Sequence, residues 1–464
     1  MSTARRSRSL AVACAIALGA AASNSYASGF QLQEQSASLL GTAFSGTAAS
    51  AEDTSVIFFN PAGMSRLKQS EVSLVATGIG IKSEFNNQAS VAAFGQPLGS
   101  DGGDAGGWNF VPSAYVAIPV NDKIAVGFAF NAPFGLELDY DGDWMGRFQA
   151  RRSMIKTYNF NPAISYRIGD RVTLGLGIDY QHIKAELSSA VNYSAVVAQG
   201  VQQLVLSGQL PPAALGPTLA ANAGLGGFTR LQGDDSTWGY NLGLLFELSD
   251  ASRLGLSYRS AISHSLDGDV IFEAPTATNP VGAGIIALAS GTGGPLAPGD
   301  VSVDLKLPET AIASFVQEFG DQWALSADVS WTGWSSIPEL RVVRDNGAVL
   351  SLTPEKWEDT WRYAVGGSFK VNPSFKLRAG LAYDNAPVPN STRTARLPDE
   401  AREWVAVGAN WTSGSVIVDL GYAHLFVKDA SINQNGGNAV AYGQIVGKQQ
   451  TSIDILSLQV GYRF

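Results

Sequence analysis

The last residues of the chain alternate between two kinds of side chain. Across 456–464 every second position is apolar, and the positions between are polar or small. Successive side chains of a β-strand point to opposite faces, so the pattern predicts a strand with one apolar and one polar face. The final residue is the aromatic Phe464. An apolar outer face, a polar inner face and an aromatic rim are typical of a transmembrane β-barrel, although an edge strand of a soluble sandwich alternates in the same way.

The same alternation recurs along the chain, at 124–131, 172–181, 237–248 and 375–384. One face of each segment carries large apolar residues, and the other carries Gly, Ala, polar or charged residues. The dry core of a sandwich excludes charges such as Arg378, whereas the lumen of a barrel accepts them. Several apolar faces begin or end in an aromatic residue, which favours a membrane barrel with interfacial aromatic girdles.

The connections between these segments are of two kinds. Short turns rich in Asn, Asp, Gly and Pro lie near 120–122, 169–170, 249–250, 320–321, 372–373 and 413–414. Long connections lie near 85–107, 132–151, 188–235, 274–300, 345–357, 386–400 and 431–448. The two kinds alternate, and this order predicts a fourteen-stranded antiparallel barrel over 71–464 with both chain ends on the short-turn, periplasmic side.

The N-terminus reads as a secretory signal peptide over 1–27. Three arginines precede an apolar stretch at 10–22, which is too short to span a bilayer as a helix, and Ser25-Tyr26-Ala27 fits a cleavage site. The only cysteine, Cys14, lies inside that stretch, so the expected mature chain has no disulfide. Residues 28–70 do not alternate and are rich in Ser, Ala and Gly. Their composition fits a plug inside the barrel and an extension below it equally well.

Composition narrows the class of protein. The formal net charge is −9 without basic clusters, which argues against nucleic-acid binding. Glycine contributes 51 residues, and 10 Trp, 14 Tyr and 21 Phe are present, yet no apolar run beyond the signal is long enough to span a membrane as a helix. High glycine and aromatic content without a spanning helix is typical of an outer-membrane barrel.

Several motifs, in order along the mature chain, resemble the FadL-type family of outer-membrane transporters for long-chain fatty acids and other hydrophobic compounds. They are Ser28-Gly29-Phe30-Gln31-Leu32, 40–46, Asn60-Pro61-Ala62, Leu307-Pro308-Glu309, 323–325, 331–335, 361–364, 384–389, Leu397-Pro398-Asp399 and Arg402-Glu403-Trp404. The resemblance implies a fourteen-stranded barrel whose lumen is plugged by an N-terminal hatch, here residues 28–70. The gating residues that it implies in this hatch include Phe30, Asn60, Pro61 and Ala62. It also implies a monomer in the cell outer membrane, in contact with its lipid and lipopolysaccharide, that moves its cargo passively and without a cofactor. Long-chain fatty acids are the cargo of one branch of the family, and aromatic hydrocarbons are that of another.

The resemblance also assigns a binding site for the carboxylate of the cargo. The family's basic positions fall on Lys184, Arg341 and Arg402 of this chain. Strand parity directs Arg402 inward, whereas Lys184 and Arg341 have the opposite parity unless a bulge, for example at Pro338, turns Arg341. Each of these cations is alternatively a lumen charge paired with a neighbouring strand. Arginine suits a carboxylate because its guanidinium forms two parallel hydrogen bonds.

Two further features point to a route for the cargo. The 188–235 and 274–300 connections are apolar, and an extracellular loop that faces only water would not be. We expect them to form short helices around a capture groove for the cargo. The residues expected to line this groove are Leu204, Leu206, Leu210, Leu215, Ile285 and Leu288. In the family an interrupted third strand opens the barrel wall sideways. Here the third strand ends at Asn131-Ala132-Pro133, where proline cannot donate to the ladder. Alternatively, the apolar loop residues pack on one another, and Pro133 only starts a loop.

Two other functions fit the barrel less well. A general polar porin needs an open lumen, which the hatch-like 28–70 disfavours. A lipid hydrolase needs Ser and His together on the lipid-facing wall, and His182 and His424 alternate with apolar residues near strand ends. The carboxylates at 139–143 lack the later Glu of a helix-loop-helix calcium loop, and no motif of a nucleophilic enzyme appears, so neither a metal site nor catalysis is expected.

Overall fold

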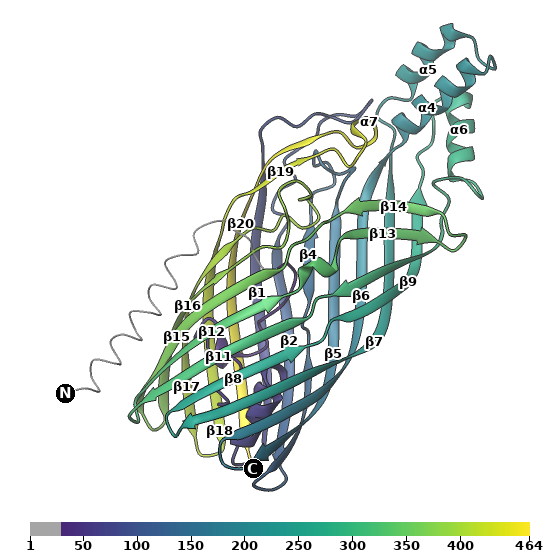
Figure 1. Ribbon diagram of the computed structural model, residues 1–464. Helices are drawn as coiled ribbons and strands as arrows, with labels where there is room; N and C mark the ends of the chain where they lie inside the picture. The colour runs from purple at the N-terminus through teal and green to yellow at the C-terminus, as the bar shows by residue number, and fades with distance from the viewer. Residues whose placement is uncertain (1–28) are drawn as a thin grey trace.

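The computed structural model describes residues 29–464, so the predicted signal peptide at 1–27 lies outside the described residues. One antiparallel sheet of twenty strand segments forms the wall of the molecule (Figure 1). The segments are β1 (Glu71–Asn87), β2 (Gly107–Pro119), β3 (Ile124–Asn131), β4 (Gly135–Asp139), β5 (Arg152–Ile168), β6 (Val172–Asn192), β7 (Gly226–Ser249), β8 (Ser252–Arg259), β9 (Ile262–Glu273), β10 (Gly299–Leu307), β11 (Thr310–Phe319), β12 (Trp323–Thr332), β13 (Glu339–Arg344), β14 (Val349–Pro354), β15 (Thr360–Asn372), β16 (Phe375–Asp384), β17 (Arg402–Ser413), β18 (Val416–Val427), β19 (Ala430–Gln434) and β20 (Ile445–Arg463).

Six of the barrel strands are each built from two segments with an interruption between them. They are β3 with β4, β8 with β9, β10 with β11, β12 with β13, β14 with β15, and β18 with β19. Counted in this way, the sheet has the fourteen strands that the sequence predicts. The barrel closes where β1 pairs with β20 in register from Glu71 opposite Arg463 to Asn87 opposite Gly447. The Nε atom of Arg463 lies 2.8 Å from a carboxylate oxygen of Glu71 across this closing seam.

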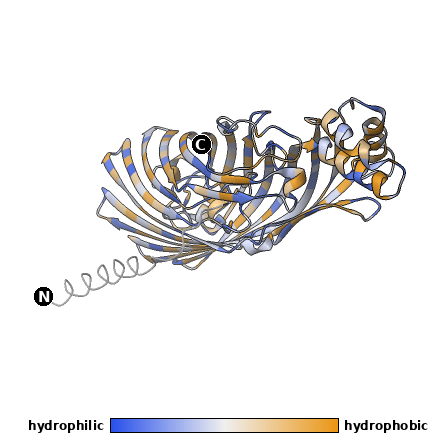
Figure 2. Ribbon diagram, turned by 90° about the horizontal axis from the view of Figure 1, so that it is seen from above, coloured by the Kyte–Doolittle hydropathy of each residue, from blue (hydrophilic) through white to orange (hydrophobic). Residues whose placement is uncertain are grey.

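The alternation along each strand separates the two faces of the wall. In β18, for example, Leu420 and Tyr422 are exposed on the outside, while Asp419 and Ala423 are buried on the inside. The bands of hydrophobic and hydrophilic residues along the strands are visible from above (Figure 2). A barrel in lipid needs this arrangement because all its backbone groups pair within the wall and only the outer side chains meet lipid.

The six predicted short turns join strands at one end of the barrel, for example at 120–123 and 414–415. The long connections lie at the other end, with one correction. The predicted long loop at 345–357 is a short turn at 345–348, and the strand continues as β14 and, after a break at 355–359, as β15. Pattern alone does not distinguish a break within a strand from a loop, because both lack alternation.

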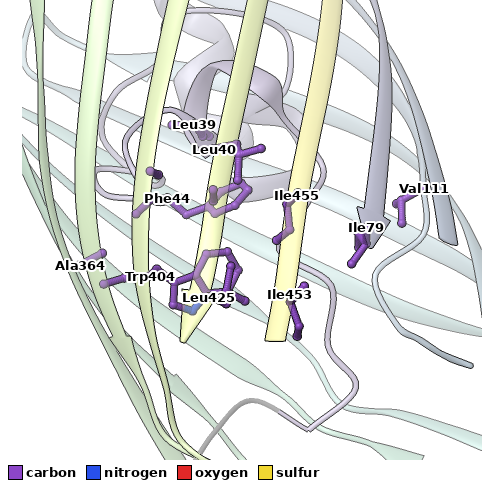
Figure 3. Close-up of a cluster of buried hydrophobic side chains, with 14 of the residues drawn as sticks. Leu39, Leu40, Phe44, Ile79, Val111, Ala364, Trp404, Leu425, Ile453 and Ile455 are labelled. Carbon is purple, nitrogen blue, oxygen red and sulfur yellow. The ribbon is translucent and has the colours of Figure 1, made fainter. Parts of the chain in front are cut away.

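The N-terminal segment lies inside the barrel as a hatch. It contains α2 (Ala37–Leu40), α3 (Val56–Phe59) and the 3-10 helix η1 (Pro61–Arg66). Glycines on the inner wall let its backbone approach closely, since a Cβ at Gly380 would lie 2.1 Å from Thr42. Arg362 of β15 donates a hydrogen bond of 2.6 Å to the carbonyl of Ala43. Figure 3 shows apolar hatch side chains, among them Leu39, Leu40 and Phe44, against side chains from the wall.

Helices lie at the end of the barrel that carries the long connections. They are α4 (Tyr193–Leu206), the 3-10 helix η2 (Pro212–Ala214), α5 (Leu215–Ala221), α6 (Pro280–Ser290) and the short α7 (Ala439–Tyr442). The helices α4, α5 and α6 stand above one side of the barrel mouth (Figures 1 and 2). A further single turn, η3 (Trp334–Ser336), lies in the break between β12 and β13. Among residues 29–464, no helix has the length and apolarity needed to cross a membrane.

Candidate functional site

The third barrel strand is interrupted between β3 and β4. β3 ends at Asn131 and β4 begins at Gly135, and Pro133 between them has no backbone N–H to donate. β2 pairs with β3 only from Pro119 to Ala114, and β4 pairs with β5 on its other side. The outer part of β2 therefore lacks a partner in β4. This is the position at which the sequence predicts a broken strand.

The start of the hatch occupies the inner side of this interruption. The backbone N–H of Leu32 donates to the carbonyl of Pro133 over 2.8 Å, and that of Gly135 donates to the carbonyl of Phe30 over 2.9 Å. Residues of the hatch thus replace β2 as hydrogen-bonding partners of the broken strand. Because buried backbone groups need partners, the hatch and the interruption stabilise each other.

The side chain of Gln35 joins the hatch to both sides of the interruption. Its Nε2 donates to the carbonyl of Ala132 over 2.7 Å, and its Oε1 accepts from the Ala132 N–H over 3.3 Å. The hydroxyl of Ser113, on β2, also donates to Oε1 over 2.8 Å. Gln35 is fully buried. One side chain of the hatch therefore connects β2 to the broken strand where their own pairing ends.

A cavity of about 360 Å³ runs along this region. Its inner wall includes Arg402, Leu425 and Ile453, whereas Phe110 and Tyr158 at its other end belong to the lipid-facing side of the barrel, where they are 68% and 39% exposed. A single cavity thus touches both the lumen and the outer surface beside the interrupted strand. Its volume falls in the range of small-molecule binding sites.

A second cavity of about 110 Å³ adjoins the first. Phe30, Leu136, Ile155 and Leu397 line both cavities. Phe30 packs edge to face against three rings, with the Trp334 ring centroid 5.1 Å away. Aliphatic side chains from several strands form most of the remaining wall. The hatch residue Phe30 therefore lies at the junction of two largely apolar spaces, which suits its predicted gating role.

Arg402 is the predicted carboxylate-binding residue that lines the first cavity. Its Nη2 donates to one carboxylate oxygen of Asp399 over 2.7 Å, and the other oxygen of Asp399 accepts the backbone N–H of Gly29 over 2.7 Å. Within the described chain, Nε of Arg402 has no hydrogen-bond partner. Burial raises the pKa of Asp399 to about 6, although Arg402 opposes this shift. The cation is thus linked to the first residues of the hatch and retains one free donor.

The other two predicted basic residues lie on the outer face of the barrel. Lys184 is exposed and stands opposite Lys156, which lines the outer end of the first cavity. Arg341 lies on the outside because its neighbours on β13 point inward. Its Nε lies 2.8 Å from a carboxylate oxygen of Glu339. The bulge near Pro338 that would have turned it inward does not form, and the register shift of β13 lies beyond Arg341. The structure does not bring these two residues together with Arg402.

Several ionisable residues that line the cavities were not singled out from the sequence, and burial shifts the pKa of three of them away from the usual value. Glu34 lines the first cavity, and Glu355 and Arg396 line the second. Burial raises the pKa of both Glu34 and Glu355 to about 7 and lowers that of Arg396 to about 10. Glu34 and Arg396 are next to recognisable motifs, which is a signal that sequence reasoning had available, but their inward position depends on segments that do not alternate.

The other hatch residues predicted to act in gating serve as an anchor. Asn60 accepts the N–H of Ala62 over 3.0 Å at the start of η1, and its Nδ2 donates to the carbonyls of Ala48 and Leu244 over 2.6 Å and 3.1 Å. Pro61 occupies the first position of that helix. None of Asn60, Pro61 and Ala62 lines either cavity. They attach the hatch to β7 away from the interruption.

The predicted capture residues divide into two groups. Leu210, Leu215 and Ile285 pack into the apolar cluster that α4 and α6 form around Val197 and Ile286. Leu206 and Leu288 are each 79% exposed, and Leu204 is half-buried. The helices therefore have an apolar interior and also present apolar side chains to the outside of the barrel mouth. Both the packing and the capture interpretations are compatible with this arrangement.

His182 and His424 lie on the outer wall and have separate partners. His182 lies 3.0 Å from Ser236 on the neighbouring strand, but among residues 29–464 no hydrogen-bond partner orients its second ring nitrogen. His424 contacts Asp454 over 2.8 Å on the outer wall. In the part of the chain that the structure describes, no group of three or more His, Cys, Asp or Glu is placed to hold a metal ion.

Comparison with known proteins gives one consistent family. The family model described as outer membrane protein transport protein (OMPP1/FadL/TodX) matches residues 18–464. The chain is 28% identical over 437 residues to the long-chain fatty acid transport protein of Escherichia coli O6:H1, covering 94% of this chain and 95% of that protein. It is 31% identical over 453 residues to a 47 kDa outer membrane protein of Pasteurella multocida, covering 97% of each.

Solved structures agree with the fold. A FadL homologue of Pseudomonas aeruginosa superimposes with a TM-score of 0.82 at 25% identity, covering 94% of this chain and 100% of that one. The toluene transporter TodX of Pseudomonas putida gives a TM-score of 0.64 at 16% identity, covering 91% and 97%, and shows the fold alone. The hatch-filled barrel, its interrupted third strand and the match over nearly the whole chain have one explanation: the chain belongs to the OMPP1/FadL/TodX family of outer-membrane transport proteins.

Proposed function

We propose that this barrel carries long-chain fatty acids passively across the outer membrane and releases them sideways through the interruption between β3 and β4. The observation that carries the proposal is the first cavity, which contains the partly buried cation Arg402 at its inner wall and reaches the lipid-facing side beside Tyr158. A hydrophobic molecule with one anionic end fits such a space. The fatty-acid transport relatives, similar over most of the chain, support the same cargo.

Capture and release follow from burial of apolar surface. The exposed Leu206 and Leu288 on α4 and α6 offer a first contact at the outer surface. Transfer of an alkyl chain from water to an apolar site contributes roughly 25 cal/mol per Å². The same contribution is available inside the cavity and again in the membrane, so the cargo moves between environments of similar free energy without an energy source. Phe30, at the junction of the two cavities, must move for the cargo to pass between them.

The carboxylate of the cargo binds to Arg402. The free Nε and one terminal nitrogen of a guanidinium match the two oxygens of a carboxylate. The cargo then competes with Asp399, which already accepts from Nη2. Displacement of Asp399 also alters its hydrogen bond with Gly29 and so affects the start of the hatch. Departure through the wall requires Gln35 to release Ala132 or Ser113. Lys156 at the outer end of the cavity meets the departing carboxylate.

Direct binding tests this function. A long-chain fatty acid and a neutral aromatic hydrocarbon are titrated into the purified barrel, as wild type, Arg402→Ala and Arg341→Ala. Arg341 is a matched control because it is an arginine on the outer face. We expect fatty-acid binding that weakens at least tenfold in Arg402→Ala only, in line with loss of a charged hydrogen bond. Equal binding by all three proteins contradicts the assignment of Arg402.

Transport of neutral aromatic hydrocarbons is the second candidate. It is favoured by the largely apolar wall of the second cavity and by the pairing of Arg402 with Asp399, which leaves no net charge on the pair. Hydrocarbon binding that is indifferent to Arg402→Ala supports this branch. A general porin is disfavoured because the hatch fills the lumen, and binding of neither ligand would return that function to consideration.

A further inference from the structure

Three buried polar atoms without a partner belong to charged residues that lie in or beside the first cavity and act on one another electrostatically. They are Oε2 of Glu34, Nε of Arg362 and Nε of Arg402, which have no hydrogen-bond partner within residues 29–464. Glu34 belongs to the hatch and is 6% exposed, and both Glu34 and Arg402 line the cavity. Arg362, on β15, lies with its guanidinium 5.2 Å from the Trp404 ring centroid. Buried polar groups are rarely left unsatisfied, so these atoms are available to hydrogen-bond with a ligand in the cavity.

The charges that act on Glu34 come from three neighbouring strands, β15, β16 and β17. Arg402 on β17 and Arg362 on β15 attract its ionised form, and Asp384 on β16 repels it. Burial outweighs these interactions and raises the pKa of Glu34 to about 7. Arg402 also forms an ion pair with Asp399 over 2.7 Å. Glu34 therefore exchanges a proton near neutral pH, at a position where a cargo carboxylate would arrive.

We propose that Glu34 selects the cargo by its own protonation state: the neutral carboxyl donates a hydrogen bond from Oε2 to the cargo carboxylate held by Arg402, and the ionised carboxylate repels it. This inference rests on the proposed function, and it makes Glu34 a specificity-determining residue of the same site. When an anionic cargo binds to the ionised form, one proton from solvent forms the O–H bond at Oε2. The same proton returns to solvent when the cargo leaves.

The affinity for an anionic cargo should depend on pH, whereas the affinity for a neutral cargo should not. If binding requires the protonated form of a group whose pKa is about 7, the affinity falls about tenfold as the pH rises from 6 to 8. A neutral cargo of the same length makes no demand on the charge of Glu34, so its affinity stays constant over this range. An ionised Glu34 leaves a buried charge beside an anion, whereas a neutral Glu34 supplies the donor that the anion lacks.

Binding of dodecanoate and dodecanol to the full barrel tests the proposal. The proteins are wild type, Glu34→Gln and the control Glu247→Gln. Glu247 contacts Arg66 of the hatch over 2.8 Å but lines neither cavity, so it reports on loosening of the hatch alone. Affinities are measured by calorimetry at pH 6 and pH 8, in buffers of different ionisation enthalpy, which also gives the number of protons taken up.

Wild type and Glu247→Gln are expected to bind dodecanoate about tenfold more weakly at pH 8 and to take up nearly one proton there. Glu34→Gln is expected to lose the share of the pH dependence and of the proton uptake that Glu34 causes, so that only the share of Asp399, whose pKa burial raises to about 6, remains. It should bind dodecanol as wild type does. A Glu34→Gln barrel that keeps the full pH dependence overturns the proposal. So does one whose affinity for dodecanol falls as much as its affinity for dodecanoate. Wild type that binds neither ligand overturns the proposed function itself.

Discussion

Arg402 donates a 2.7 Å hydrogen bond to the same carboxylate of Asp399 that accepts the backbone N–H of Gly29. One acidic side chain therefore connects the cation of the cavity to the first described residues of the hatch. A carboxylate that binds to Arg402 competes with Asp399 and weakens its attachment to Gly29. Under the proposed function, this contact would couple cargo binding to the position of the hatch.

Neutralising Asp399 should strengthen the binding of a fatty acid. Asp399→Asn retains an oxygen that accepts the Gly29 N–H but removes the charge that competes for Arg402. A hydrogen bond to a charged group contributes about 1.5 kcal/mol or more, so we expect roughly tenfold tighter binding. Titration of the purified variant measures this change. Asp454→Asn, which removes a carboxylate on the outer wall, is the control, and unchanged affinity in Asp399→Asn would contradict the competition.

Removing the Gln35 side chain should loosen the interrupted strand. Gln35→Ala deletes the hydrogen bonds to Ala132 and Ser113 and leaves buried groups unpaired, at about 1–3 kcal/mol for each. Hydrogen exchange followed by mass spectrometry is expected to accelerate at 130–135. Gln459→Ala is a matched control because Gln459 accepts from the hatch at Ala37 without touching the interruption. Equal acceleration at 130–135 in both variants would assign Gln35 a general role in holding the hatch.

A side chain at Gly380 should displace the hatch and open the lumen. The Cβ of Gly380→Val meets the backbone of Thr42 at 2.1 Å, so a shift of the hatch is required. We expect a raised single-channel conductance in planar bilayers and a destabilisation of about 1–3 kcal/mol, typical of overpacking. Gly226→Val places its Cβ in open space and should conduct as wild type does. A closed Gly380→Val barrel would show that the hatch adjusts without leaving the wall.

The contact between α4 and α6 should matter for capture. A Cβ at Gly200 would lie 2.6 Å from Ile285, whereas one at Gly284 meets nothing within 4 Å. Gly200→Ala is expected to separate the two helices and to slow fatty-acid uptake by cells several-fold, while the equilibrium affinity of the internal site stays unchanged. Gly284→Ala should transport as wild type does. Uptake that is equally fast in both variants would indicate that these helices only cover the barrel mouth.

The sequence by itself determined the wall of this protein. The alternation in segments such as 375–384 fixed which face meets lipid, because a strand has a period of two and only apolar side chains are stable against hydrocarbon. The order of short turns and long connections determined the fourteen strands. The same parity directed Arg402 inward and correctly placed Lys184 outward. Wherever the backbone was regular, the local pattern of apolar and polar residues was sufficient to predict which way each side chain points.

Only the tertiary structure decided what happens where the backbone is irregular. The hatch has no alternation, so the sequence did not reveal that Gln35 would join Ser113 to Ala132, or that Glu34 would line the cavity with an unpaired oxygen. For the same reason, the pattern does not distinguish the break at 355–359 from a loop. These features depend on contacts between residues far apart in the chain, and such contacts are set by how the hatch packs within the closed barrel, for which no local period exists.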